Sequence, residues 1–303
     1  MRQGKYRFIV GFLAAPVILY AVFVIGPYVQ AFQIALTNWH GFSPAQYTGL
    51  DNFKQLFKDD VFWAAVRNHL VILLVLPLAT IVLALLFSFL LNVGGKGRGG
   101  QMSGVRGSSF YKVIFFLPQV LAVAIVAVLF QTVYRPNKSG MINGLLDKFG
   151  VAPVGWLTNP SIALYSVIAV MVWQAVGFYV VLFSAGMSSI PKDLFEAAAL
   201  DGAGRFTLFF RVTLPLLWDT LQVGWVYLGI AAFDGFAIVQ VLTSNNYEQD
   251  TSTTVLAMET YRNAFRYGKW GYASAMGVAL FFMTITFAAL TLRITRRRES
   301  IEF

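Results

Sequence analysis

The sequence LVILLVLPLATIVLALLFSFLL, residues 70–91, is a long apolar stretch that contains no charged residue. At a rise of about 1.5 Å per residue, a helix of this length crosses a hydrocarbon core of about 30 Å. Similar stretches recur along the chain at residues 8–29, 113–133, 162–185, 216–241 and 272–292. The sequence therefore predicts an all-α, polytopic membrane protein with six transmembrane helices in one domain, residues 1–303.

The overall composition agrees with this class. The chain is 57% hydrophobic and 12% charged, with a mean hydropathy of +0.66, whereas soluble domains contain roughly 25% charged residues. The absence of cysteine excludes disulfides, thiolate catalysis and cysteine-based metal sites. The net charge of +9 does not indicate nucleic-acid binding, because the basic residues punctuate apolar runs and form no soluble patch.

The first apolar stretch resembles a signal peptide, since Arg2, Lys5 and Arg7 precede it. It is, however, longer than a typical signal-peptide core, and no small-residue cleavage pattern follows it. We therefore expect it to be retained as a transmembrane helix.

The distribution of lysine and arginine predicts the orientation of the helices. With the amino terminus in the cytoplasm, the inner segments hold 14 basic residues and the outer segments hold 9. This bias favours both termini inside the cell. It also places the segment between the fourth and fifth spans, residues 188–215, on the cytoplasmic side.

Two features that resemble chemical sites are better explained otherwise. The glycine-rich GKGRGG, residues 95–100, lacks the strand and helix context of a dinucleotide-binding turn and the flanking residues of a phosphate-binding loop. His40 and His69 have no partners at metal-ligand spacing. The sequence therefore predicts no catalytic site, no metal site and no cofactor in this chain.

Several polar and aromatic residues of the later spans are candidates for a solute path. A charged residue inside a membrane is costly and usually has a function, which draws attention to Asp234. A helix-to-helix hydrogen bond, or a helix break assisted by Gly235, explains Asp234 equally well. Aromatic faces with amide groups suit a polyol ligand, although ordinary packing and interfacial belts explain each of these residues individually. The candidates are Trp173, Gln174, Tyr179, Tyr227, Asp234 and Gln240.

The cytoplasmic segment 188–215 has the pattern of a helix, a glycine turn and a second helix. Pro191 and Asp193 suit a helix start, and three consecutive alanines favour helix. Asp201-Gly202 favours a turn, in which Gly202 permits a left-handed stop. Composition alone is consistent with an interfacial amphipathic connector.

The same segment resembles the signature loop of the membrane subunits of binding-protein-dependent ABC importers. That family's pattern is Glu-Ala-Ala, three residues, Gly, nine residues, Ile, one residue and Leu-Pro. Here Glu196-Ala197-Ala198, Gly202 and Leu214-Pro215 match it, and Val212 replaces the isoleucine.

Further stretches are similar to the carbohydrate-type permeases, including the maltose, glycerol-phosphate and oligosaccharide permeases. They are residues 49–70, with His69 where threonine is commoner, and the late segments FDGFAIVQVLT, TSTTVLAMETYRNAF and GYASAMGVAL. The stretch SNNYEQD, residues 244–250, departs from the usual Gly-Gly-Pro. The resemblance covers nearly the whole chain and is strongest from about residue 110.

The resemblance implies a type I ABC importer permease that forms half of a sugar pathway. Its partners would be a second homologous permease subunit, two cytoplasmic ATPase subunits that bind ATP and Mg²⁺, and an extracytoplasmic solute-binding protein. The residues implied to couple to the ATPase are Glu196, Ala197, Ala198, Asp201 and Gly202. An ion-gradient-driven secondary transporter is the alternative, but internal repeats and clustered intramembrane carboxylates are not evident. A structural or assembly protein would explain the spans but not the signature loop.

Overall fold

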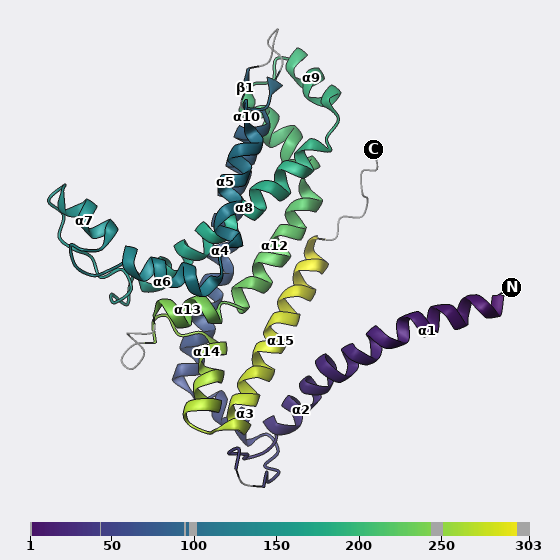
Figure 1. Cartoon of the computed structure of the whole chain (residues 1–303), viewed down its shortest axis with the longest axis vertical. Coiled ribbons are helices and arrows are strands. Elements are labelled where there is room, and N and C mark those ends of the chain that lie inside the picture. The colour runs from purple at the N-terminus through teal and green to yellow at the C-terminus, as the bar shows by residue number, and fades with distance from the viewer. Residues whose placement is uncertain (1, 43, 94, 97–101, 244–250, 296–303) are drawn as a thin grey trace. The chain divides into compact units, whose positions relative to one another are not determined.

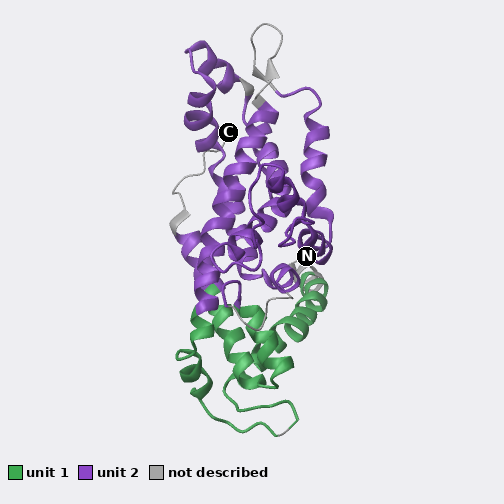
Figure 2. Cartoon of the chain, turned by 90° about the vertical axis from the view of Figure 1, so that its left-hand side faces the viewer, with its two compact units in different colours: residues 1–63, 256–283 green, residues 64–255, 284–303 purple. Residues whose placement is uncertain are grey.

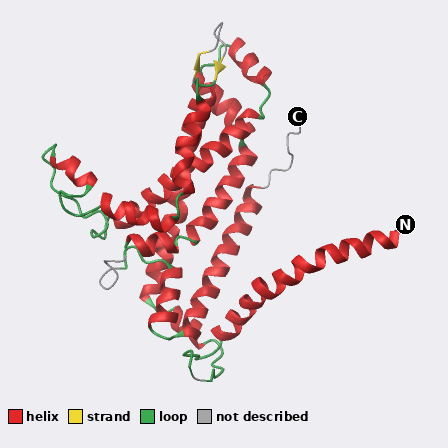
Figure 3. Ribbon diagram, viewed as in Figure 1, coloured by secondary structure: helices red, strands yellow, loops and turns green. Residues whose placement is uncertain are grey.

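The computed structural model of the chain describes residues 2–42, 44–93, 95–96, 102–243 and 251–295 (Figure 1). Helices dominate, and the described residues contain one short antiparallel strand pair, β1 (Gly95–Lys96) with β2 (Met102–Ser103) (Figure 3). Within these described ranges, four helices are long and apolar enough to cross a membrane, or up to six if each of two bent pairs is one span. The predicted all-helical membrane class is therefore confirmed.

The chain is divided into two compact units, which Figure 2 colours separately. Unit 1 comprises Met1–Trp63 and Leu256–Met283, and unit 2 comprises Ala64–Val255 and Thr284–Phe303. Two long helices, α4 (Asp60–Val93) and α15 (Trp270–Thr295), run through both units.

Unit 1 is built on aromatic and small residues of its helices. Phe32 packs edge-on against Phe281 at 5.7 Å and Phe282 at 5.8 Å between ring centroids. Ala35 and Ala275 are buried in the small core beside them. Besides parts of α4 and α15, the unit contains α1 (Arg2–Tyr20), a π-helical turn (Ala21–Ile25), α2 (Gly26–Ala35), α3 (Asp51–Leu56), α14 (Leu256–Tyr261) and a second π-helical turn (Arg262–Arg266).

Unit 2 is organised around α8 (Ala163–Ser188), which is more than half buried and contacts α5, α6, α12 and α13. The helix pair α5–α8 approaches closely at Gly177, where an added Cβ atom would collide with the carbonyl oxygen of Phe115. The other helices of the unit are α5 (Ser108–Val120), α6 (Val123–Val133), α7 (Met141–Asp147), α9 (Lys192–Leu200), α10 (Arg205–Leu208), a π-helical turn (Phe209–Thr213), α11 (Leu214–Leu216), α12 (Trp218–Phe233) and α13 (Phe236–Leu242).

The stretch expected as a third span, residues 113–133, is bent. Its two halves, α5 and α6, meet at 96°. Pro118 has no N–H for the helix ladder, and Leu121 and Ala122 adopt extended backbone angles directly after it. Gln174 of α8 donates its Nε2–H to the carbonyl oxygen of Leu121 at 3.2 Å, which satisfies a backbone group that the bend exposes.

The stretch expected as a fifth span, residues 216–241, is interrupted twice. The segment 205–216 meets α12 at 72°, with the bend at Leu217. Farther along, α12 ends at Phe233 and α13 begins at Phe236, so Asp234 and Gly235 form a break. The break at Gly235 that the sequence offered as one explanation of Asp234 is present.

The connection between α6 and α8 is held together by one buried side chain, that of Asn143. Its Nδ2 donates to the carbonyl oxygens of Arg135 at 2.8 Å and Val154 at 2.9 Å. Its Oδ1 accepts from the Val154 N–H at 3.0 Å and from the Trp156 Nε1–H at 3.1 Å. A segment with little regular structure thereby gains a fixed conformation.

Candidate coupling loop and solute path

The helix predicted around Glu196 is α9, Lys192–Leu200. Pro191 precedes it with an extended backbone, and Asp193 lies in its first turn, where a carboxylate complements the helix dipole. The second predicted helix follows as α10, Arg205–Leu208. The helix, glycine turn and helix that the sequence predicts are therefore confirmed. Both helices lie at the same end of unit 2 as β1 (Figure 1).

A complete C-terminal cap ends α9. The N–H of Ala203 donates to the carbonyl oxygen of Ala198 at 2.9 Å, and the N–H of Gly202 donates to that of Ala199 at 3.1 Å. This pair of bonds is the Schellman pattern, which requires a left-handed residue between them. Gly202 supplies it with a φ of +80°, as the sequence predicted. An added Cβ atom would meet no neighbour within 4 Å. Glycine is therefore favoured here by the left-handed backbone and not by a lack of space.

The residues assigned to coupling share one exposed helix end. Glu196, Ala197, Asp201 and Gly202 are exposed, and Ala198 is half-buried. Two large apolar side chains close by were not anticipated from the sequence: Leu200 is 89% exposed and Phe206 is 83% exposed. The sequence did contain a signal for their exposure. Leu200 follows the alanine run and Phe206 follows the glycine turn, and both lie outside the apolar spans. Exposed apolar groups on a rigid loop are suited to protein contact.

The loop is fixed to the helices behind it. Leu208 and Thr213 are buried, and the ring of Phe209 packs edge-on against Phe89 of α4, with centroids 4.9 Å apart. The π-helical turn Phe209–Thr213 and α11 continue directly into α12. The segment that follows α9 is therefore joined to α4 by packing and to α12 by continuous backbone.

The three solute-path candidates of α8 have different surroundings. Trp173 is 41% exposed and packs edge-on against Phe130 of α6 at 5.1 Å. Gln174 is engaged at the bend between α5 and α6. Tyr179 is buried and packs against Gly224 of α12.

The three remaining candidates belong to α12, α13 and the break between them. Tyr227 is 64% exposed. Asp234 is exposed at the end of α12, where its backbone N–H bonds to the carbonyl oxygens of Ile230 and Ala231. Gln240 is half-buried in α13.

Two cavities of unit 2 have mainly apolar walls. The larger, about 760 Å³, lies between α4, α5 and α8 and includes Trp173 alone among the path candidates. The smaller, about 470 Å³, was not anticipated from the sequence. It lies between α4, α11, α12 and α15 and is lined by Ile81, Leu85, Leu214, Trp218, Leu221, Gln222, Trp225 and Thr291. Neither of these two cavities brings the six path candidates together.

Metal binding finds no support in the part of the chain that the structure covers. Groups of three or more His, Asp or Glu side chains able to hold an ion are absent among the described residues. The stretch SNNYEQD and most of GKGRGG lie outside those residues.

Comparison with known proteins gives a consistent family. Residues 99–300 match the sequence profile described as the binding-protein-dependent transport system inner membrane component. The chain is 40% identical to the diacetylchitobiose uptake system permease protein of Streptomyces coelicolor over 296 residues, which cover 96% of this chain and 83% of the relative. It is 32% identical to the xylose/arabinose import permease protein of Haloferax volcanii, over 89% of this chain and 82% of the relative.

A solved structure has the same fold. One chain of a bacterial ABC transporter involved in the import of the acidic polysaccharide alginate superimposes with a TM-score of 0.82. The match covers 99% of this chain and 100% of that chain at 24% sequence identity.

Proposed function

The chain belongs to the family of binding-protein-dependent transport system inner membrane components, and from this premise we propose that it forms half of the pathway of an ATP-driven sugar importer. As an inner-membrane permease subunit of an ABC transporter it moves a solute and catalyses no reaction itself. The observation that carries the proposal is the exposed helix α9, closed by a C-terminal cap, at the family's signature loop. An ion-gradient mechanism would give such a helix no role.

The proposed role of α9 is mechanical. Its end is closed by two hydrogen bonds around Gly202, so it can dock as a rigid body into a cytoplasmic ATPase subunit. Glu196 and Asp201 offer exposed carboxylates to that partner, and Ala197 leaves room for close approach. The packed connection through Phe209 and α11 then passes movement of the ATPase to α4 and α12.

The proposed complex has four kinds of component. A second homologous permease subunit completes the pathway, and two ATPase subunits bind ATP and Mg²⁺. An extracytoplasmic solute-binding protein delivers the solute. The transporter for alginate, which shares this fold, has been crystallised in complex with a periplasmic protein that holds an alginate pentasaccharide.

The proposed solute is a mono- or short oligosaccharide, with diacetylchitobiose as the first compound to test. The 40% identical relative is named for diacetylchitobiose, and another, 30% identical from Streptococcus mutans, is a multiple sugar-binding transport system permease protein. Indole, phenol and amide groups at Trp173, Tyr227 and Gln240 are suited to sugar rings and hydroxyls. Asp234 adds one acceptor for hydroxyl or amide hydrogens.

Purification of the tagged chain from its native cell tests the assembly. We expect a second polytopic subunit and a P-loop ATPase to co-purify. Glu196→Arg should abolish recovery of the ATPase but not of the second permease. Lys148→Glu, an exposed charge reversal in the connection between α6 and α8, should leave both in place. A chain that purifies alone and transports under an ion gradient would contradict the proposal.

A further inference from the structure

Two adjacent polar residues, Asn68 and His69, lie in the 34-residue helix α4, directly before its long apolar stretch. Asn68 is 8% exposed and His69 is 0% exposed. Burying an amide or an imidazole is unfavourable unless its polar atoms form hydrogen bonds. Both residues have such bonds, and the carbonyl groups that accept them are far away in the sequence.

His69 contacts the end of α12. Its Nδ1 lies 3.3 Å from the carbonyl oxygen of Ala232, and its ring packs against Phe233 with centroids 5.5 Å apart. The last four carbonyls of any helix lack a partner within that helix, and at membrane depth such groups must be satisfied by other parts of the protein. A proton on Nδ1 makes His69 a donor to Ala232, and we assign that tautomer. The histidine thereby satisfies backbone at the break.

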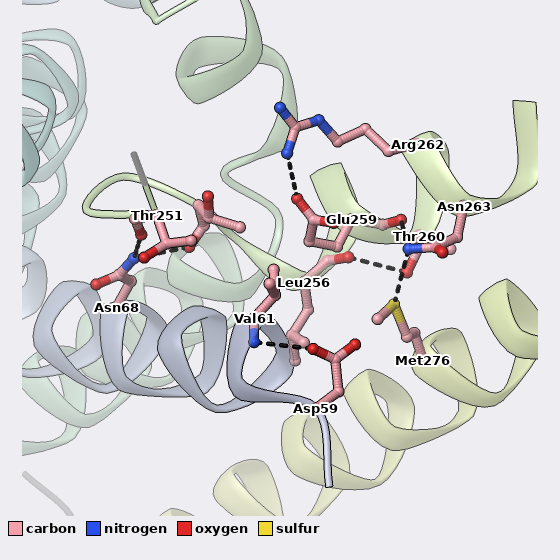
Figure 4. A network of polar contacts seen from close by, with 11 residues as sticks. Asp59, Val61, Asn68, Thr251, Leu256, Glu259, Thr260, Arg262, Asn263 and Met276 are labelled. Carbon is pink, nitrogen blue, oxygen red and sulfur yellow. Dashed lines mark hydrogen bonds and ion pairs between the residues drawn. The ribbon is translucent and has the colours of Figure 1, made fainter. Parts of the chain in front are cut away.

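Asn68 contacts backbone that follows α13 in the sequence. Its Nδ2 group donates one N–H to the carbonyl oxygen of Thr251 and the other to that of Thr254, both at 2.9 Å (Figure 4). Thr251 to Val255 is non-helical, and the N–H of Thr254 closes a turn onto Thr251. One amide group therefore holds two carbonyls of this turn.

The two contacts flank α13. His69 holds the backbone just before this helix, and Asn68 holds the backbone that follows it after residues 244–250, which lie outside the described chain. Within α13, the carbonyl oxygen of Val241 accepts a hydrogen bond from Gln131 of α6. The seven-residue helix α13 is thus hydrogen-bonded to α6, and backbone before and after it is hydrogen-bonded to α4.

We propose that Asn68 and His69 are positioning residues of the solute path. They fix the break between α12 and α13 and so determine where the exposed carboxylate of Asp234 lies, one residue after the ring that stacks on His69. They act through the backbone and are not assigned a contact with the solute. The inference rests on the proposed place of Asp234 in the path, but the geometry can be measured without transport.

The absence of cysteine from the chain allows a direct measurement. Asp234→Cys introduces a single thiol, whose reaction rate with a membrane-impermeant maleimide reports the exposure and mobility of the break. The full importer complex is labelled in lipid nanodiscs, and the same complex without the Asp234→Cys substitution gives the background. The test compares His69→Asn, whose side-chain N–H occupies the place of the Nδ1–H of histidine, with His69→Met, which has no donor.

The labelling rate with His69→Asn should stay within about twofold of the parent, and His69→Met should change it about fivefold, the factor for one lost hydrogen bond. Asn68→Asp is an independent variant because it keeps the side-chain shape and removes both N–H donors. It should change the rate about 25-fold, the fivefold factor taken once for each of the two lost hydrogen bonds. Ile72→Val, at a buried position one turn along α4, should leave the rate unchanged.

Sugar uptake is measured in parallel with Asp234 intact. His69→Met should lower the maximal uptake rate, and His69→Asn should keep it close to that of the parent. The proposal would be overturned if the introduced thiol reacted at the same rate in the parent, in His69→Met and in Asn68→Asp. Failure of both variants to assemble, while Ile72→Val assembles, would also overturn it by showing a purely structural role. If the His69 and Asn68 variants change the labelling rate but Asp234→Asn takes up sugar normally, then the two residues position the break and Asp234 is not part of the solute path.

Discussion

The amide N–H of Ala203 donates to the carbonyl oxygen of Ala198 over 2.9 Å, and this bond closes α9 around a left-handed glycine. The contact joins residues five apart and satisfies a carbonyl group at the end of α9, which opposes fraying of the helix end.

Gly202→Ala should weaken this cap. Alanine is disfavoured by about 1–2 kcal/mol in a left-handed conformation, so we expect faster hydrogen exchange over residues 198–203 and weaker stimulation of ATP hydrolysis by the binding protein. Gly204→Ala is the matched control, because Gly204 has a φ of −71° and an added Cβ meets nothing within 4 Å. Equal exchange in the two variants would show that the cap does not depend on Gly202.

Removing the exposed apolar groups of the loop should weaken ATPase binding. Leu200→Ser and Phe206→Ser should each lower the affinity for the ATPase about tenfold, as expected for apolar anchors of an interface, with no loss of thermal stability. Leu145→Ser, at a 56% exposed position of α7, serves as the control. Affinity can be measured by titrating the ATPase onto permease in nanodiscs. Unchanged affinity in both loop variants would place the interface elsewhere.

Gly177→Ala should disrupt the approach of α5 to α8. An alanine methyl would overlap the carbonyl oxygen of Phe115, and overpacking of this kind costs about 1–3 kcal/mol. We expect a lower thermal unfolding temperature in detergent and poorer recovery of the complex. Gly277→Ala in α15, where the added Cβ atom meets nothing within 4 Å, should be neutral or slightly stabilising. The prediction is wrong if the two variants have the same thermal unfolding temperature.

Asn143→Leu should loosen the connection between α6 and α8. The substitution leaves the carbonyls of Arg135 and Val154 and the indole N–H of Trp156 without this partner, at a cost of about 1–3 kcal/mol for each group that stays buried. Limited proteolysis between residues 134 and 162 should accelerate, while Asn137→Leu, at an exposed position, should have a smaller effect. Unchanged proteolysis in Asn143→Leu would mean that other contacts fix this segment.

The apolar stretches were sufficient to predict the class of fold, because a membrane-spanning helix needs about 20 apolar residues in one run. They could not predict the 96° bend after Pro118, since prolines are tolerated in membrane helices and the bend depends on Gln174 of another helix. The glycine turn at Gly202 was predictable because Asp-Gly chemistry is local.

The surroundings of His69 were not predictable in the same way. Its hydrogen-bond acceptor is 163 residues away in the sequence, so nothing near His69 reveals it. The solute-path candidates have the same difficulty: aromatic and amide residues have the same local pattern whether they pack, bridge helices or face a solute. Gln174, expected along the path, is engaged at the bend.

The length of α4 has a consequence of its own. Its 34 residues extend about 51 Å, roughly 20 Å more than the hydrocarbon thickness of a bilayer. A rigid rod of this length that pivots by about 10° at one end moves its other end by about 9 Å, which exceeds the width of a sugar ring. Small rotations of one continuous helix are therefore large enough to open or close an aperture for a saccharide, without any helix unwinding.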